Sequence, residues 1–131
     1  YSPASNTWGV EDRTVALRVP SGAARTRHFE HRVAGVDANP YLLAAVTLGT
    51  ALDGIAAGAG AGVAGAAGAA DHTALPGNWQ AAITAFAGSK AMRRILGPAL
   101  HQGFAAIKQA EHDLLATEVT EAEWRLYGFV V

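Results

Sequence analysis

The stretch that decides the fold is Arg13–Val46, RTVALRVPSGAARTRHFEHRVAGVDANPYLLAAV. Within it, Thr14–Val19 places successive side chains on alternate faces with valine and leucine on one of them, which is the pattern of a half-buried strand. Pro20-Ser21-Gly22 predicts a turn, because proline cannot continue a strand ladder and glycine permits the bend. The alternation resumes over Arg25–Val33. We therefore expect two strands that pair as a β-hairpin.

One face of the second predicted strand gathers charged side chains. Strand geometry puts His28, Glu30 and Arg32 on the same face. Arg18 can lie near this row if the two runs pair. A carboxylate in the middle of a strand needs a partner where it is buried, because an isolated buried charge is costly. Two interpretations follow: a structural ion pair of Glu30 with Arg18 or Arg32, or a metal ligand whose neighbouring arginines hold anionic substrate groups.

The hairpin is followed by a segment typical of a helix. Asn39 is a good N-cap and Pro40 suits the first helical position. The helix is apolar nearly all round, which predicts burial, and Gly54 is expected to end it. The Ala/Gly tract 56–70 is interpreted as a flexible or poorly ordered connection. The predicted organisation of the single segment 1–131 is loop and β-hairpin (1–38), buried helix (39–55), Ala/Gly-rich connection (56–74) and helices (75–131).

Residues 75–131 are predicted to form helices joined by short turns. Four helices are expected, over Trp79–Ala87, Lys90–Leu96, Pro98–Glu118 and a final segment that begins after Thr120. Asn78 and Ser89 are candidate caps, and Thr120 with Glu123 matches a capping box. Three histidines lie on these helices or on loops and are expected to face solvent: His72, His101 and His112. A hairpin followed by helices defines an α+β fold class.

The composition and spacing of the residues argue against several functions. The net charge of −1 argues against binding nucleic acid or acidic lipid through global charge. The chain has no cysteine, and His28 and His31 fall on opposite faces of a strand, so a zinc site is disfavoured. The Ala/Gly tract lacks the Lys-Ser/Thr of a phosphate-binding loop. The apolar run 41–52 is too short to cross a membrane. We expect neither a nucleic-acid partner nor a membrane span.

Two linked motifs resemble a known family. They are W-G-V-E-D-R-T-V-A-L-R-V-P from Trp8 and R-H-F-E-H-R-V-A-G-V-D-A-N-P-Y-L from Arg27. Together they resemble the C-terminal part of the glutamine synthetase catalytic domain, most closely the branch that includes the γ-glutamylpolyamine synthetases. The similarity is dense over Asn6–Leu48 and looser, but in the same order, over Leu75–Tyr127.

The resemblance implies an ATP-dependent ligase. Such enzymes join ammonia or an amine to the γ-carboxyl of glutamate through γ-glutamyl phosphate, with ATP and Mg²⁺ or Mn²⁺ as cofactors. The implied partners are glutamate, ATP and either ammonia or a polyamine, and which amine is accepted stays open. The implied assembly is a homo-oligomer, a hexameric ring or a dodecamer, and the implied location is cytoplasmic.

By motif position, the resemblance also implies roles for the charged residues. Glu30 would be a ligand of one of two divalent metals, and Arg32 would hold a carboxylate of glutamate. Arg13 and Arg18 would face the phosphate that is transferred. Metal and arginine are suitable for this reaction, because it builds negative charge on phosphoryl oxygens.

The same motifs place Arg25 and His28 near the nucleotide, although His28 stands where many members carry arginine. The family's other metal-binding glutamates lie upstream of the similar segment. We therefore expect this chain to be a fragment that is inactive alone. The alternative, from another class, is a non-enzymatic small α+β module whose basic hairpin binds an anionic partner.

Overall fold

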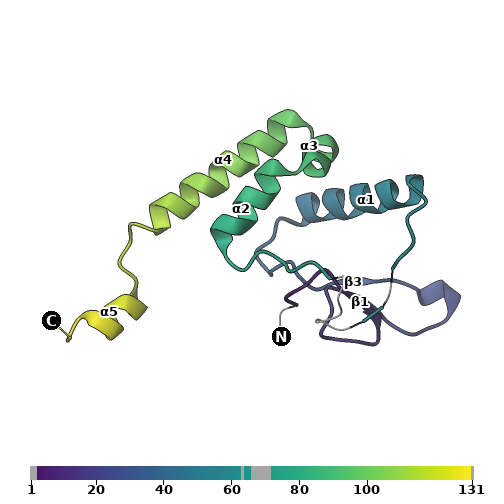
Figure 1. Ribbon diagram of the computed structural model, residues 1–131, viewed down its shortest axis with the longest axis horizontal. Helices are drawn as coiled ribbons and strands as arrows, with labels where there is room; N and C mark the ends of the chain where they lie inside the picture. Colours follow the sequence, from purple (N-terminus) through teal and green to yellow (C-terminus); the bar gives the residue numbers. More distant parts are fainter. Residues whose placement is uncertain (1–2, 63, 66–71, 131) are drawn as a thin grey trace. The chain divides into compact units, whose positions relative to one another are not determined.

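The computed structural model describes residues 3–62, 64–65 and 72–130. The chain divides into two compact units, Tyr1–Gly77 and Asn78–Val131. Among the described residues, the first unit holds a small sheet and one long helix, and the second holds helices alone (Figure 1). This order of strands followed by helices confirms the predicted α+β class.

The sheet has three short strands in the order β1-β2-β3. Their bounds are Trp8–Val10 for β1, Leu17–Val19 for β2 and Glu30–His31 for β3. β2 and β3 are antiparallel, with Arg18 opposite Glu30, which confirms the pairing of the two predicted runs. β1 runs parallel to β2. It lies in the part of 1–38 ahead of the predicted hairpin, which was expected to be loop, so the prediction is wrong for Trp8–Val10. A three-residue strand is too short to show an alternating pattern.

The second predicted strand is much shorter than expected. Of the run Arg25–Val33, only Glu30–His31 pairs in the sheet, and Ala24–Thr26 forms a 3-10 helix, η1. The Thr26 hydroxyl donates to the carbonyl oxygen of Ala23 at 3.0 Å. A threonine side chain that bonds to nearby backbone offers an alternative to the strand ladder, which accounts for the local turn.

The long helix α1 (Pro40–Ala56) begins where predicted. The Asn39 side chain accepts hydrogen bonds from the backbone N–H of Tyr41 and Leu42, at 3.0 and 3.2 Å. The helix continues two residues past Gly54, so the predicted end is wrong. Gly58, with φ of 62°, supplies the left-handed residue that follows many helix ends.

The predicted burial of the helix over 39–55 is wrong. All residues of α1 are described and none of them is buried. Tyr41 and Ile55 are 85% and 77% exposed. The physical reason is that α1 lies over the small sheet, which covers only one side of it (Figure 1).

Packing between α1 and the sheet leaves a cavity of about 760 Å³ with mostly apolar walls. Leu43 and Val46 line it from the helix, and Trp8 and Leu17 line it from the sheet. The buried apolar core of the first unit, within the part described, is confined to Val15 and its neighbour in sequence, Ala16.

The two ends of the first unit are joined by backbone hydrogen bonds. Asn6 donates to the Thr73 carbonyl at 3.0 Å, and the Thr73 N–H donates to the Asn6 side-chain oxygen at 2.7 Å. Leu75 donates to the Ala4 carbonyl at 2.9 Å. The Ala/Gly tract 56–70 is predicted to be flexible, and its positions 63 and 66–70 lie outside the described residues.

The second unit contains the helices predicted for it. They are α2 (Trp79–Gly88), α3 (Lys90–Leu96), α4 (Pro98–Leu115) and α5 (Glu121–Tyr127). Asn78 caps α2, Ser89 caps α3, and the predicted capping box of Thr120 and Glu123 is present at α5. The helix α4 ends three residues before the predicted Glu118. In the part of the chain that is described, no helix is long and apolar enough to cross a membrane.

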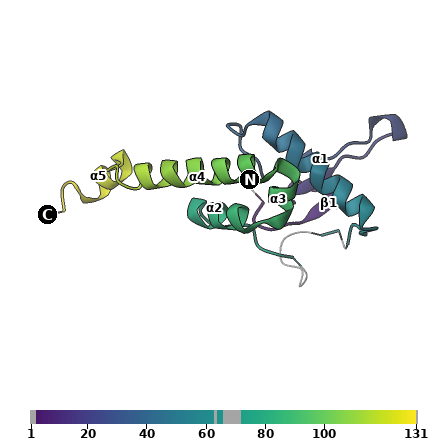
Figure 2. The same cartoon turned by 90° about the horizontal axis from the view of Figure 1, so that it is seen from above.

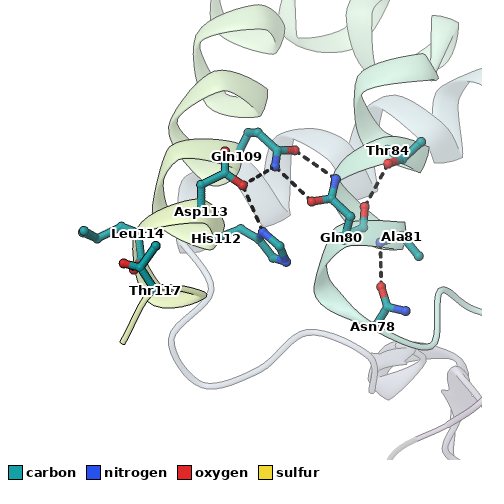
Figure 3. A network of polar contacts seen from close by, with 9 residues as sticks. All are labelled: Asn78, Gln80, Ala81, Thr84, Gln109, His112, Asp113, Leu114 and Thr117. Carbon is teal, nitrogen blue, oxygen red and sulfur yellow. Dashed lines mark hydrogen bonds and ion pairs between the residues drawn. The ribbon is translucent and has the colours of Figure 1, made fainter. Parts of the chain in front are cut away.

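The helices α2 and α4 lie side by side (Figures 1 and 2) and are joined by side-chain amides. Gln80 and Gln109 exchange two hydrogen bonds, each of 2.9 Å, as Figure 3 shows. Gln109 also donates to Asp113 at 2.8 Å, and this bond is the main cause that lowers the pKa of the Asp113 carboxyl. The reciprocal pair fixes the register of the two helices.

The prediction that His101 faces solvent is wrong, because its side chain is buried between α4 and α2 with the residue only 3% exposed. Its Nε2 lies 2.8 Å from the Phe86 carbonyl oxygen, and the ring centroids of the two residues are 4.8 Å apart. His72 and His112 are both half-buried.

Gly97, which joins α3 to α4, provides a test of backbone strain. Its φ of 78° and ψ of 154° lie in a region that is essentially restricted to glycine. A Cβ there would meet no other atom within 4 Å, so a substitution acts through the backbone alone. We expect Gly97→Ala to lower the free energy of unfolding by about 1–3 kcal/mol, measured by urea denaturation.

The matched control is Gly103→Ala in the interior of α4, where a Cβ also meets nothing within 4 Å. Alanine is the better helix former, so this variant should gain about 0.5–1 kcal/mol. Equal effects of the two substitutions would contradict the assigned conformation of Gly97.

Candidate active site

The candidate site is centred on Arg18 in the middle of β2. Its Nη1 donates to Glu30 Oε1 at 2.7 Å from the neighbouring β3, and its Nη2 donates to Glu11 Oε2 at 2.5 Å. Arg32 Nη1 lies 3.6 Å from the second oxygen of Glu30. The Arg18 side chain is only 14% exposed. The hairpin therefore brings together three of the predicted site residues, Arg18, Glu30 and Arg32.

Glu11 belongs to this cluster although the sequence prediction missed it. It lies just after β1, where its backbone N–H donates to the Val19 carbonyl at 3.1 Å. One carboxylate oxygen accepts from Arg18, and the other accepts the backbone N–H of Ser21. No signal in the sequence could have revealed it, because only the parallel pairing of β1 with β2 brings this carboxylate, seven residues before Arg18, next to that arginine.

Hydrogen bonds shift the pKa values of Glu11 and Arg18. The Ser21 backbone N–H, followed by Arg18, lowers the pKa of the Glu11 carboxyl below its ordinary value. Glu11, followed by Glu30, raises the pKa of the Arg18 guanidinium. Because the pKa of Glu11 is lower in the folded state, its interactions stabilise the fold fully above the unfolded-state pKa near 4.5. This stabilisation is lost as the pH falls through the folded-state pKa. Both charges are therefore present at neutral pH.

Arg18 keeps donors free for a ligand. A guanidinium has five N–H donors, and the two carboxylates each take one from a different terminal nitrogen. The Nε atoms of Arg18 and Arg32 are buried without a hydrogen-bond partner among the described residues. Each terminal nitrogen of Arg18 therefore retains an N–H that can bind an anionic oxygen.

The other predicted site residues are not joined to the cluster. Arg13, Arg25 and His28 are exposed. Arg13 lies in a tight turn between β1 and β2. In this turn Asp12 Oδ1 accepts two hydrogen bonds from Thr14, one from its backbone N–H and one from its hydroxyl, both at 2.7 Å. Arg25 lies in η1, and His28 Nδ1 lies 2.8 Å from the Thr26 carbonyl oxygen. No hydrogen bond or ion pair joins these three to Glu30 among the described residues.

The described residues do not form a complete metal site. Glu30 offers one carboxylate, and both of its oxygens are engaged by arginines. No group of three or more His, Cys, Asp or Glu side chains is arranged to hold a metal in the described part of the chain. Hard divalent cations need several oxygen ligands, so Glu30 can supply one ligand but not the whole set.

Comparison with known proteins identifies the class. The family model of the glutamine synthetase catalytic domain matches residues 1–127. The chain therefore belongs to the glutamine synthetase family, a family of glutamate ligases, as its two motifs indicated.

Three relatives show the breadth of this similarity. Gamma-glutamylputrescine synthetase of Escherichia coli is 47% identical over 42% of this chain and 12% of its own length. Lengsin of Mus musculus is 30% identical over 89% of this chain and 21% of its own. Glutamine synthetase of Methanococcus maripaludis is 27% identical over 96% of this chain and 30% of its own. The chain thus spans at most 30% of the length of these relatives.

Proposed function

We propose that this chain is the C-terminal part of the catalytic domain of an ATP-dependent ligase that joins ammonia or an amine to the γ-carboxyl of glutamate. The observation that carries the proposal is the cluster of Arg18 on β2, Glu30 on β3 and Arg32 just after β3, inside the two motifs of the family. The names of two relatives, a gamma-glutamylputrescine synthetase and a glutamine synthetase, support both an amine and ammonia as candidate acceptors.

The reaction balances in two steps. A γ-carboxylate oxygen of glutamate attacks the terminal phosphorus of ATP, and ADP leaves. The nitrogen of the amine then attacks the carbonyl carbon of γ-glutamyl phosphate, loses a proton and expels phosphate. Negative charge grows on phosphoryl oxygens in the first step, so catalysis requires positioned cations.

The residues of this chain supply those cations. Arg18 directs its free terminal N–H groups to the phosphoryl oxygens, and Arg13, on the neighbouring turn, binds the same group. Arg32 binds a carboxylate of glutamate as a planar fork. Arg25 and His28, on the exposed connection between β2 and β3, contact the nucleotide.

Glu30 serves as one ligand of a bound Mg²⁺ or Mn²⁺, and the remaining ligands come from parts of the enzyme outside these 131 residues. When bound, the cation would neutralise charge on the phosphoryl oxygens. Assembly into a homo-oligomer, a hexameric ring or a dodecamer, completes the proposal.

The product of the complete reading frame tests this function. We expect ADP and phosphate release that requires glutamate together with one amine from a panel of ammonia, putrescine and ethanolamine. The isolated 131-residue chain should show no such activity, because it supplies only one carboxylate for the metal. Absence of glutamate-dependent ADP release with every amine would refute the ligase, and turnover by the isolated chain would refute the shared site.

A further inference from the structure

Glu11 has a backbone conformation that its side chain does not favour. Its φ of 54° lies in the left-handed region, where residues other than glycine are uncommon. Glycine would adopt the same conformation without steric cost. The backbone N–H is held by the Val19 carbonyl, so the conformation is imposed by the sheet. Such positions are often found at functional sites, and here the carboxylate has both oxygens in use.

We propose that Glu11 is a positioning residue that holds the Arg18 guanidinium in the orientation needed to bind the transferred phosphoryl group. This inference rests on the proposed function, in which Arg18 contacts that group. Glu11 is itself anchored by the backbone N–H of Ser21, so the carboxylate is fixed at one oxygen and holds Arg18 with the other.

Two contacts are needed to fix a planar guanidinium. Glu30 binds only the Nη1 side, and a single contact leaves the plane able to rotate about it. Glu11 binds the Nη2 side from the opposite direction in the sheet. Because the two carboxylates lie on β3 and just after β1, on either side of β2, they fix the guanidinium from both edges of the central strand.

Glu11 becomes more important when Glu30 has another partner. Glu30 is already shared between Arg18 and Arg32, and in the proposed function it also binds a cation. A Glu30 oxygen that bound a cation would no longer accept the hydrogen bond from Arg18. Glu11 has no such second role, and its lowered pKa keeps it ionised at neutral pH. Glu11 is therefore the carboxylate that holds Arg18 throughout the reaction.

The test compares Glu11→Gln and Glu11→Gly in the protein made from the complete reading frame. We expect kcat to fall by about 10- to 100-fold in both, because a small misplacement of a contacting group has that effect. KM for ATP should stay equal or fall, since Arg18 loses a neutralising carboxylate and its charge attracts the nucleotide more strongly. Glu111→Gln is the matched control: Glu111 bonds Lys108 at 2.7 Å on α4, and its variant should keep the wild-type kcat.

Thermal unfolding separates positioning from folding. Glu11→Gly removes the unfavourable side chain from a left-handed backbone, so its Tm should equal or exceed that of Glu11→Gln while its kcat stays low. A wild-type kcat in either variant would overturn the inference. So would a rise in the KM for ATP with kcat unchanged.

A readout that does not need activity distinguishes this inference from the proposed function. Phenylglyoxal modifies arginines, and mass spectrometry of peptides gives the rate at each site. Arg18 should react several-fold faster in Glu11→Gln than in the wild type, with Arg125 as the internal reference. An unchanged Arg18 rate would refute the positioning role. If the wild type shows no ligase activity but Arg18 reacts faster in Glu11→Gln, the proposed function fails, whereas the hold of Glu11 on Arg18 is supported.

Discussion

Replacement of Glu30 with glutamine is expected to lower the kcat of the complete enzyme by at least about 100-fold, because changes to groups that only support a metal ligand already cost about 10–100-fold. Glutamine keeps the shape of the side chain, and its one oxygen can still accept a hydrogen bond from Arg18. Its amide nitrogen cannot accept from Arg32, and the side chain has no charge for a divalent cation. The Mn²⁺ concentration at half-maximal activity should therefore rise as well.

The metal dependence decides between the two roles of Glu30 that the sequence left open. A purely structural ion pair would lower Tm in the glutamine variant and leave the half-saturating Mn²⁺ concentration unchanged. That outcome would contradict the metal role. Glu121→Gln is the matched control, since Glu121 forms an exposed ion pair with Arg125 in α5 and should affect neither quantity.

Replacement of Arg18 with lysine is the second large expected effect. Lysine keeps the charge but offers a single compact ammonium in place of a planar fork. It cannot bind Glu11 and Glu30 from two separate nitrogens and also present donors to a ligand. We expect kcat to fall by at least about 100-fold, the size of effect seen when one electrostatic donor is removed from an active site.

The same variant should also lower Tm, because two carboxylates would face each other across β2 with a weaker cation between them. Arg125→Lys, in the exposed pair on α5, is the control for a generic exchange of arginine for lysine and should leave both kcat and Tm unchanged. If Arg18→Lys retained the wild-type kcat, Arg18 would be a structural counter-ion and not a phosphate ligand.

Local patterns predicted the helices and the pairing of the hairpin, but not the lengths of its strands. The alternation predicted Arg18 near the row that holds Glu30, and the two residues are paired in the sheet. The caps Asn39, Asn78 and Ser89 marked three helix starts correctly. These features depend on side chains within a few positions of each other or on one hairpin. The class of the fold follows from their order.

Features that depend on distant partners were not predicted. Glu11 joins the site only because β1 pairs in parallel with β2, and a three-residue strand leaves no pattern in the sequence. His101 is buried because α2 places the Phe86 carbonyl within reach of its ring. The exposure of α1 was missed because an all-round apolar helix signals burial, whereas the described part of this chain covers only one of its sides. The roles of Arg13, Arg25 and His28 rest on motif position alone.

The hydrogen bonds that join the segments around Asn6 and Thr73 bear on how much the length of the chain between them can vary. Asn6 and Thr73 are 67 positions apart, and the Ala/Gly tract lies between them. The entropy lost in closing a loop grows only with the logarithm of its length, so even a doubling costs roughly 0.6 kcal/mol. We therefore expect insertions and deletions between α1 and Thr73 to cost little stability where they leave the hydrogen bond from Gly65 to the Trp8 carbonyl in place. Relatives can diverge in length at this point while the arginine and glutamate pairs of the sheet keep their spacing.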